Sequence, residues 1–402
     1  MRVFVVDNGL KSAAGHHLNN AIGLMDALRG RGVETSFLIN KAVDVHVAQA
    51  VSGDPVFSFT PYDRISGDEL SGELESFMLQ GRVLGAELGR AISGKIRSED
   101  VIVVATATHI ELLALSTCLA RIAESSRPRV VCNFIKEHFA NGVSGSYTEL
   151  AKYYRFAFKS LAAHLDPSTL FLSANSDAMA CALSHVFERE VVVLPIPKIY
   201  PPCLISAVTS RRPGKDLVIG VFGDMNSYKG FGYIPQLVRS NPCFSWVIQS
   251  AKSGNEKSWG RDCEWVSNCP NVRIVPGGLL PDEYYRLYSR VDIVLLPYNP
   301  DERCLQTSGV FAESVASGRV VVCPATAWIE QKSREGKWAG VCFSRQDLEA
   351  ISAALAHVAS NFDELRRKAL DLAPKWAASE CVASFVDAIL KKFENNAQEK
   401  AR

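Results

Sequence analysis

The chain alternates short apolar runs with segments in which apolar residues recur every three or four positions. The first apolar run, 3–6, is followed by a glycine-containing loop, a helically spaced segment over 17–29 and another apolar run at 34–39. Short continuous apolar runs are typical of parallel strands buried on both faces, whereas the wider spacing marks one face of a helix. The start of the chain therefore predicts a βαβ unit.

This alternation continues to about residue 200 and restarts after residue 215. In the first half we predict further strands at 101–105, 129–134 and 191–194, and helices over 110–123, 147–165 and 176–187. In the second half we predict strands at 217–222, 244–249, 272–275, 293–296 and 320–323, with helices between them. The fold class is therefore α/β, with two Rossmann-like domains.

A proline-rich and charged stretch separates the two halves. Four prolines at 195, 197, 201 and 202 precede the segment SRRPGKD. Such composition is typical of a linker. We therefore predict an N-terminal domain over 1–200, a linker over 201–215, a C-terminal domain over 216–375, and a last segment, 376–402, whose amphipathic part packs back on the N-terminal domain as a helix.

Composition excludes several classes of protein. Lys and Arg number 44 against 43 Asp and Glu, whereas a nucleic-acid-binding domain usually has a basic surplus. Apolar residues make up 47% of the chain, enough for packed cores. No run approaches the roughly 18–20 apolar residues that span a bilayer. The N-terminal sequence MRVFVVDNGL meets an aspartate after four apolar residues, so it does not resemble a signal peptide.

The eleven cysteines are scattered and form no CxxC pair. This distribution favours reduced, mostly buried thiols over a disulfide framework or a zinc site. We therefore expect a cytoplasmic protein. Because ligands of open parallel sheets bind at the carboxyl ends of the strands, we expect function in a cleft between the two domains, faced by the loop after the first strand of each.

The loop after the first strand of the second domain suits a diphosphate. Gly223 ends the strand, and Lys229 with Gly230 stands just before a helix. A small residue allows close backbone approach, a helix N-terminus supplies amide donors, and the lysine supplies positive charge. An ordinary loop with a solvated lysine is the alternative that the sequence leaves open.

A second candidate element begins at Ser308 and Gly309, which open a helix that carries Glu313. The first amides of this helix, at Ser308, Gly309 and Val310, could hold phosphate oxygens. The Glu313 carboxylate could accept both hydroxyls of a ribose. Alternatively, Glu313 is only a favourable charge near a helix N-terminus.

These motifs resemble those of the GT-B glycosyltransferases, particularly the group-1 or GT4-like retaining enzymes. That family typically carries G-R-x4-K-G, N-V-x3-G, D-E-x4-Y, A-D-x4-P, E-x7-E and G-x-P-V-V in its second domain. The resemblance covers about 150 residues and implies two Rossmann-like domains that face each other across a cleft. The matching positions, in order, are Gly223, Lys229-Gly230, Asn271-Val272, Asp282-Glu283, Tyr288, Val291-Asp292, Pro297, Glu313, and Gly318 with 320–322.

The chain departs from the family at two positions. The arginine of the first motif falls on Asp224, and the first glutamate of E-x7-E falls on Leu305. The resemblance implies that Lys229 and Glu313 keep phosphate and ribose recognition, whereas sugar recognition must be rebuilt. We expect Arg303 to replace the missing cation. Replacement acceptors for the sugar hydroxyls are expected from Gln306, Thr307 and Ser308.

In the first domain, the resemblance implies a small-residue loop over 12–17 near the donor phosphates. Gly15 and His16 are then expected on the donor side and His17 on the acceptor side. His109, after the strand at 101–105, is a further acceptor-side candidate. His138 follows the strand at 129–134 and is the candidate catalytic residue. For each histidine, a helix cap or a plain loop position is the alternative.

The resemblance implies transfer of a sugar from a nucleotide-diphosphate donor to a hydroxyl of a glycan or lipid-linked acceptor, with retention, as in polysaccharide biosynthesis. It also implies neither a metal nor a cofactor, and allows peripheral contact at the inner membrane face. No DxD-like pair follows a predicted strand, and Asp301 and Glu302 are only weak candidates for sugar contacts. A sugar-nucleotide epimerase and a non-catalytic GT-B partner subunit remain alternatives. A dehydrogenase is disfavoured, because neither glycine loop has the GxGxxG pattern.

Overall fold

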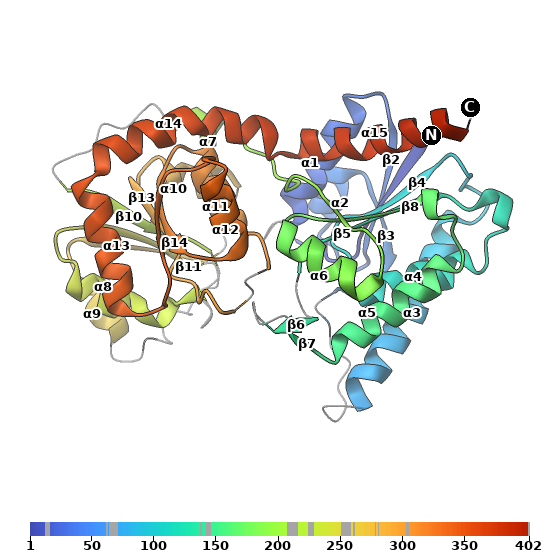
Figure 1. The fold of residues 1–402 in the computed structure, drawn as a ribbon, viewed down its shortest axis with the longest axis horizontal. Helices are drawn as coiled ribbons and strands as arrows, with labels where there is room; N and C mark the ends of the chain where they lie inside the picture. The colour runs from blue at the N-terminus through green and yellow to red at the C-terminus, as the bar shows by residue number, and fades with distance from the viewer. Residues whose placement is uncertain are drawn as a thin grey trace. The chain divides into compact units, whose positions relative to one another are not determined.

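The computed structural model divides the chain into two compact units, residues 1–197 with 382–402, and residues 198–381 (Figure 1). We call them the first and the second unit. The structure describes residues 1–12, 17–61, 63, 71–136, 139–141, 146–206, 216–223, 229–250, 259, 262–277, 279, 281–302 and 305–400.

The first unit contains a seven-stranded parallel sheet in the order β3-β2-β1-β4-β5-β8-β9. Its strands are β1 (Arg2–Asp7), β2 (Glu34–Asn40), β3 (Gly53–Phe57), β4 (Val101–Val104), β5 (Arg129–Phe134), β8 (Leu170–Ala174) and β9 (Val192–Val193). Its helices are α1 (His17–Arg29), α2 (Val45–Val51), α3 (Ser71–Ile92), α4 (His109–Leu119), α5 (Leu150–Ala162), α6 (Asp177–Phe187) and α15 (Val382–Lys400). The two-residue strands β6 (Ala140–Asn141) and β7 (Ser146–Tyr147) pair antiparallel.

Helices cover both faces of this sheet. On one face, α15 packs along α1, and the aromatic ring of Phe393 lies against Arg129 of β5 (Figure 1). On the opposite face, Phe134 of β5 contacts Tyr154 of α5, which packs beside α4 and α3. Because successive side chains of a strand point to opposite faces, the odd-numbered residues of β5 face α15 and the even-numbered ones face α5.

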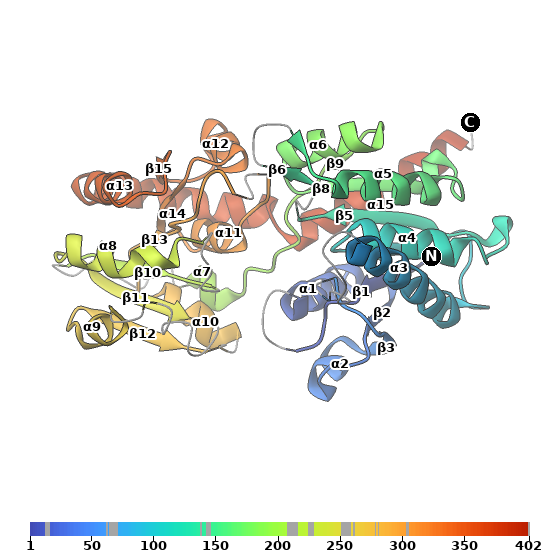
Figure 2. The same cartoon turned by 90° about the horizontal axis from the view of Figure 1, so that it is seen from below.

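The second unit contains a six-stranded parallel sheet in the order β12-β11-β10-β13-β14-β15 (Figure 2). Its strands are β10 (Val218–Val221), β11 (Ser245–Ser250), β12 (Val272–Pro276), β13 (Ile293–Leu295), β14 (Val320–Pro324) and β15 (Gly340–Phe343). Its helices are α7 (Pro202–Ser206), α8 (Ile234–Ser240), α9 (Asp262–Asn268), α10 (Pro281–Tyr288), α11 (Gly309–Ala316), α12 (Ala327–Arg334), α13 (Leu348–Ser360) and α14 (Phe362–Ser379). Strand residues such as Trp246, Ile293 and Val320 form its buried core.

The predicted α/β class with two Rossmann-like sheets is confirmed, but several element bounds differ. The helix predicted over 147–165 begins only at Leu150, because Tyr147 of β7 pairs with Ala140 of β6. The sequence patterns did not reveal β3, β8 or β15. The last predicted helical segment is two helices, since α14 ends at Ser379 and α15 begins at Val382.

The predicted linker over 201–215 is partly folded. Residues 202–206 form α7, which packs on α10 and α11 of the second unit. Residues 207–215 lie outside the described part of the chain. The division between the units falls after Pro197 and after Cys381, rather than near residues 200 and 375.

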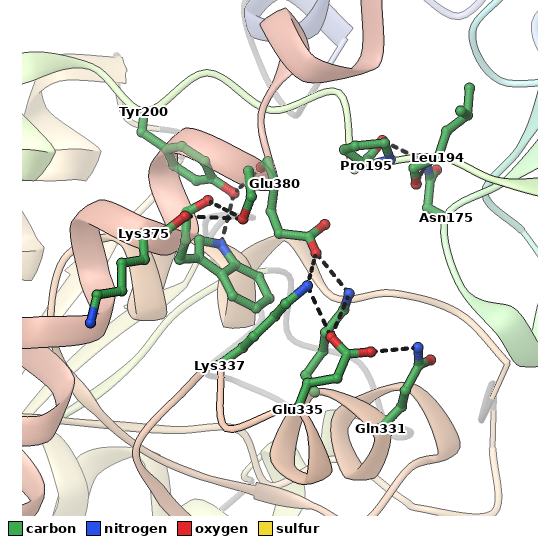
Figure 3. A network of polar contacts seen from close by, with 12 residues as sticks. Asn175, Leu194, Pro195, Tyr200, Gln331, Glu335, Lys337, Lys375 and Glu380 are labelled. Carbon is green, nitrogen blue, oxygen red and sulfur yellow. Dashed lines mark hydrogen bonds and ion pairs between the residues drawn. The ribbon is translucent and has the colours of Figure 1, made fainter. Parts of the chain in front are cut away.

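Hydrogen bonds hold both of these boundary segments on the second unit (Figure 3). The Tyr200 hydroxyl donates to the Glu380 carbonyl at 2.8 Å and accepts from the Trp376 indole at 3.1 Å. The Glu380 carboxylate in turn accepts from Lys332 at 2.7 Å and from Lys337 at 3.4 Å. Segments 180 residues apart in the sequence are therefore joined, which is why residues after Pro197 belong to the second unit.

Candidate donor site

The first turn of α11 is fixed by a cap and by aromatic packing. Ser308 is the N-cap residue, and its hydroxyl accepts a hydrogen bond from the Phe311 amide at 3.2 Å. The Phe311 ring packs edge-on against Trp328, Trp338 and Trp376, with ring centroids 5.2, 5.3 and 5.9 Å away. The start of this helix is therefore where the sequence predicts it, and its first backbone amides are held in a rigid position.

Glu313 of α11 is buried, with 4% of its surface exposed, and it accepts three hydrogen bonds. Its Oε1 accepts from the Lys198 ammonium at 2.7 Å. Its Oε2 accepts from the hydroxyls of Tyr284 and Tyr288, both on α10, at 3.0 and 3.1 Å. A buried carboxylate needs such partners, because an unpaired charge inside a protein is strongly unfavourable.

Both tyrosines remain protonated donors. Burial, and then the negative charge of Glu313, raise the pKa of Tyr284 well above its ordinary value. For Tyr288, burial comes first, followed by the neighbouring Tyr284 and then Glu313. A carboxylate offers about four acceptor positions, and three are used here. Glu313 thus has room for about one further donor, fewer than the two ribose hydroxyls expected from the sequence.

Lys198 occupies the space beside the first residue of α11. A Cβ atom at Gly309 would lie 3.0 Å from both Cε and Nζ of Lys198, so the glycine leaves room for the lysine. The lysine is 9% exposed. Its ammonium therefore lies at the positive end of the helix dipole, where a cation is disfavoured unless a carboxylate such as Glu313 compensates it.

The structure brings Gly223, Lys229 and Val310 together. Gly223 has a φ of +109°, and a Cβ at this position would lie 3.5 Å from the Lys229 ammonium and 3.7 Å from Val310 Cγ2. The Gly223 amide donates to the Gln249 side chain at 2.9 Å. Gly223 and Lys229 belong to the first candidate phosphate element of the sequence analysis, and Val310 belongs to the second. The structure thus places the two elements next to each other, with a side-chain methyl of Val310 as the contacting atom.

Gly230 is required by packing. Its φ is +68°, and a Cβ there would lie 1.8 Å from the carbonyl oxygen of Pro297. The same oxygen accepts a hydrogen bond from the Gln346 side chain at 2.7 Å. The glycine of the lysine–glycine pair therefore lets the backbone at residue 230 lie close to the backbone at Pro297, just after β13.

The segment before α11 differs from the family pattern in its chemistry. Leu305, which occupies the position of the family's first glutamate, is buried. The buried Nε2 atom of Gln306 has no hydrogen-bond partner among the described residues, and Thr307 is half-buried. A buried amide without a partner is costly, so this nitrogen is suited to a ligand acceptor.

In the first unit, His17 is a buried side chain at the start of α1. Its Nδ1 lies 2.8 Å from Oδ1 of Asp7, the last residue of β1. A Cβ at Gly9 would fall within 3.0 Å of the imidazole ring, so the loop after β1 packs closely on it. His109 lies in an aromatic cluster instead, with ring centroids 5.2 Å from Phe77 and 5.0 Å from Tyr154.

A buried polar network at the carboxyl ends of β1 and β4 was not predicted. Glu111 forms a capping box with Thr108, whose amide donates to the carboxylate at 2.9 Å. Asn8 donates to the other oxygen at 2.9 Å, and Asn40 donates to the Asn8 carbonyl at 3.1 Å. Burial raises the pKa of Glu111. β1 and β4 lie where the strand order reverses, the usual ligand position of such a sheet.

Solved structures with this architecture are numerous, although no family profile and no curated protein matches the sequence. A sucrose-phosphate synthase from Thermosynechococcus elongatus is 13% identical, with 98% of this chain and 100% of that chain covered and a TM-score of 0.67. A glycosyltransferase from Rickettsia africae is 11% identical, with 98% of each chain covered and a TM-score of 0.65. The chain has the GT-B glycosyltransferase fold.

Another GT-B structure of this kind is the Anabaena protein HepE in complex with UDP. It is 13% identical, with 98% of this chain and 100% of that chain covered and a TM-score of 0.66. HepE was also solved with UDP-glucose. Identities this low establish the fold alone.

Several predicted GT-B site residues lie outside the part of the chain that the structure describes. They are Gly15, His16, His138 and Arg303, and Asp224, the departure from the family's arginine, lies outside it as well. Within the described part, no three His, Cys, Asp or Glu side chains are grouped so that they could hold a metal ion. The described helices include none that is long and apolar enough to cross a membrane.

Sequence reasoning missed Lys198 and Tyr284, although both contact Glu313. Lys198 is 115 residues from Glu313 in the sequence, and it stands in a stretch that was interpreted as the approach to a linker. Tyr284 lies one helical turn before Tyr288, the tyrosine of the matched motif. The spacing of two tyrosines at i and i+4 on α10 was the only sequence signal available.

Proposed function

We propose that this chain is a glycosyltransferase that moves a sugar from a nucleotide-diphosphate donor to a hydroxyl of a glycan or lipid-linked acceptor. The observation that carries the proposal is the meeting of Gly223, Lys229 and Val310 at the start of α11. The GT-B fold supports it, since HepE with this fold was solved with UDP and with UDP-glucose.

In this proposal the diphosphate binds between Lys229 and the first amides of α11, at Ser308, Gly309 and Val310. Helix N-termini bind phosphate because their amides are unpaired and the dipole favours negative charge. Gly223 gives the backbone room beside the phosphates. Thr307 and the Gln306 amide then face the donor sugar, while Glu313 accepts a single ribose hydroxyl.

The chemistry we propose needs no metal and no strong protein base. The bond between the sugar anomeric carbon and the diphosphate breaks, and the acceptor oxygen attaches on the same face. The acceptor proton passes to the departing phosphate oxygen. Lys229 and the α11 amides stabilise the charge that develops on the diphosphate. The first unit then holds the acceptor, with His17 fixed by Asp7 at the end of β1.

Peripheral membrane contact belongs to the same proposal, because the acceptors in question include lipid-linked glycans. On α5, Phe156 is 51% exposed, and Lys152 and Lys159 follow the same helical face. An apolar ring among cationic side chains suits an anionic membrane surface. Sedimentation with anionic vesicles tests this part, and equal binding of wild type and Phe156→Ala would contradict it.

A non-catalytic nucleotide-binding subunit is the second candidate. The buried Leu305 favours it, since an apolar side chain cannot replace a glutamate that contacts a sugar. The chain thus lacks the family's first glutamate, whereas Gly223, Lys229 and Val310, which we propose contact the phosphates, lie close together. This candidate predicts nucleotide binding without turnover of any sugar donor.

A thermal-shift screen against UDP, GDP, ADP, CMP and dTDP, each with and without its sugar, tests the proposal. A ligand at about 100 times its dissociation constant stabilises a protein by roughly 2.7 kcal/mol, which moves the midpoint visibly. We expect one diphosphate to shift wild type and to shift Lys229→Ala less. Lys368→Ala, an exposed lysine on α14, is the matched control. Flat traces across the panel would overturn donor binding.

A further inference from the structure

Two cysteines stand side by side at the edge of the second sheet. Cys323 of β14 pairs directly with Cys342 of the neighbouring parallel strand β15. Directly paired residues point to the same face, and neighbouring strands lie about 4.7–4.9 Å apart. Disulfides bridge Cα atoms about 4.4–6.8 Å apart, so the register places these cysteines within bonding range. Both are free thiols in the structure.

The two thiols have different environments. Cys323 is fully buried, and burial raises its pKa well above the ordinary value. Cys342 is partly exposed, and a hydrogen bond with Cys323 lowers its pKa. A thiolate is the reactive form of cysteine, so the accessible partner is also the more nucleophilic one. The buried partner lies where it can resolve an oxidised Cys342.

The other buried cysteines that the structure describes lack this arrangement. Burial raises the pKa of Cys118 to about 12 and raises that of Cys132 further. The strand partners of Cys132 are Val104 and Leu172. These thiols are therefore ordinary core side chains, as the sequence predicts for cysteines of this distribution.

We propose that Cys323 and Cys342 form a redox-modification site that hydrogen peroxide converts into a disulfide. The Cys342 thiolate attacks one peroxide oxygen, the O–O bond breaks, and the released hydroxide becomes water by taking up a proton. The Cys323 sulfur then attacks the sulfenic sulfur of Cys342, the S–O bond breaks, and a second water leaves. In total, two thiols lose two electrons and two protons to one peroxide.

The disulfide would close a loop that contains α12. That helix carries Lys332, which contacts Glu380 at the boundary of the second unit. Oxidation therefore ties β14 covalently to the edge strand β15 and constrains the segment that holds this boundary. The inference rests on strand register and is independent of the proposed transferase activity.

Peptide mapping of the full-length protein tests the proposal. Trypsin cuts after Arg319, Lys332, Lys337 and Arg345, so Cys323 and Cys342 fall in separate peptides, 320–332 and 338–345, each with one cysteine. After treatment with hydrogen peroxide and digestion without reductant, we expect these peptides joined, with a mass two hydrogens below their sum. Reductant should separate them completely.

Single-cysteine variants distinguish the thiol that reacts with peroxide, Cys342, from the thiol that resolves it, Cys323. Cys342→Ser should lose the joined peptide, and Cys323→Ser should accumulate a sulfenic acid at Cys342 that dimedone captures. Cys181→Ser, an exposed cysteine on α6, should form the joined peptide at a rate within twofold of wild type. Oxidation of Cys342 in wild type without any joined peptide would overturn the proposal, and this result does not depend on how the variants fold.

Discussion

Glu111 in the first unit and Glu313 in the second are both buried glutamates near the start of a helix that follows a parallel strand. Their partners differ in kind. Glu111 accepts hydrogen bonds from Thr108, three residues away, and from Asn8. The partners of Glu313 are Lys198 and two tyrosines of another helix.

Glu111 thus completes the start of its own helix, whereas Glu313 joins several segments of the second unit. A capping box satisfies backbone donors locally, and it forms wherever a helix of suitable sequence begins. The Glu313 cluster joins α10, α11 and the segment that enters the second unit. The second unit therefore has a buried ion pair beside the N-terminus of α11, whereas the Glu111 carboxyl caps the start of its own helix, α4.

The largest expected effect is on the Glu313 cluster. Glu313→Ala leaves the Lys198 ammonium buried without its carboxylate, which typically costs about 3–5 kcal/mol. Urea unfolding measures the loss, and Glu349→Ala, an exposed glutamate in the first turn of α13, is the control. The double variant Lys198→Met/Glu313→Leu should be more stable than Glu313→Ala. A loss below 1 kcal/mol in Glu313→Ala would show that the ion pair contributes little.

Lys229→Ala should weaken nucleotide-diphosphate binding with little change in stability, because Lys229 is only partly buried. A lost hydrogen bond to a charged group costs about 1.5–3 kcal/mol, which is roughly 10- to 150-fold in affinity. Isothermal titration calorimetry with the diphosphate identified in the screen measures this affinity. Lys368→Ala, measured in the same way, is the control. Unchanged affinity would remove Lys229 from the site and leave the α11 amides as the remaining phosphate contacts.

Glu111 should make stability depend on pH. Burial raises its pKa in the folded state, so the folded protein holds this proton more tightly than the unfolded chain does. The stabilisation is complete below the ordinary glutamate pKa of about 4.3 and is lost as pH rises through the folded value.

Urea unfolding of wild type and of Glu111→Gln, whose side chain cannot titrate, between pH 4.5 and 7.5 tests the direction of this pH dependence. The unfolding free energy of wild type minus that of the variant should fall with rising pH, by at most about 1.4 kcal/mol per pH unit. A constant difference would mean that the Glu111 pKa is the same in both states.

The smallest effects concern the tyrosines of α10. Tyr284→Phe and Tyr288→Phe should each cost about 1 kcal/mol, because the other hydroxyl still donates to Glu313 Oε2. The double variant leaves that oxygen without either donor, so its loss should exceed the sum of the two. Tyr233→Phe, outside the cluster, is the control. Additive losses in urea unfolding would mean that the two hydroxyls act independently.

Local patterns predicted most of the fold and part of the site. Buried strands such as β1 and β4 are short apolar runs, and the start of α11 carries its cap at Ser308. β3 was missed because its sequence, GDPVF, contains Gly, Asp and Pro, which strands usually avoid, and it pairs only at the sheet edge.

The tertiary structure decided which distant residues meet. Lys198 and Glu313 form an ion pair, and Cys323 and Cys342 become neighbours through strand register. A sequence pattern reports on residues within a few turns or one strand, because propensity and periodicity act locally. Contacts between remote segments depend on how whole elements pack, and on the room that Gly309 leaves for the Lys198 side chain and Gly230 for the Pro297 backbone. The sequence by itself thus determined the elements and the candidate positions, and packing determined which of them share a site.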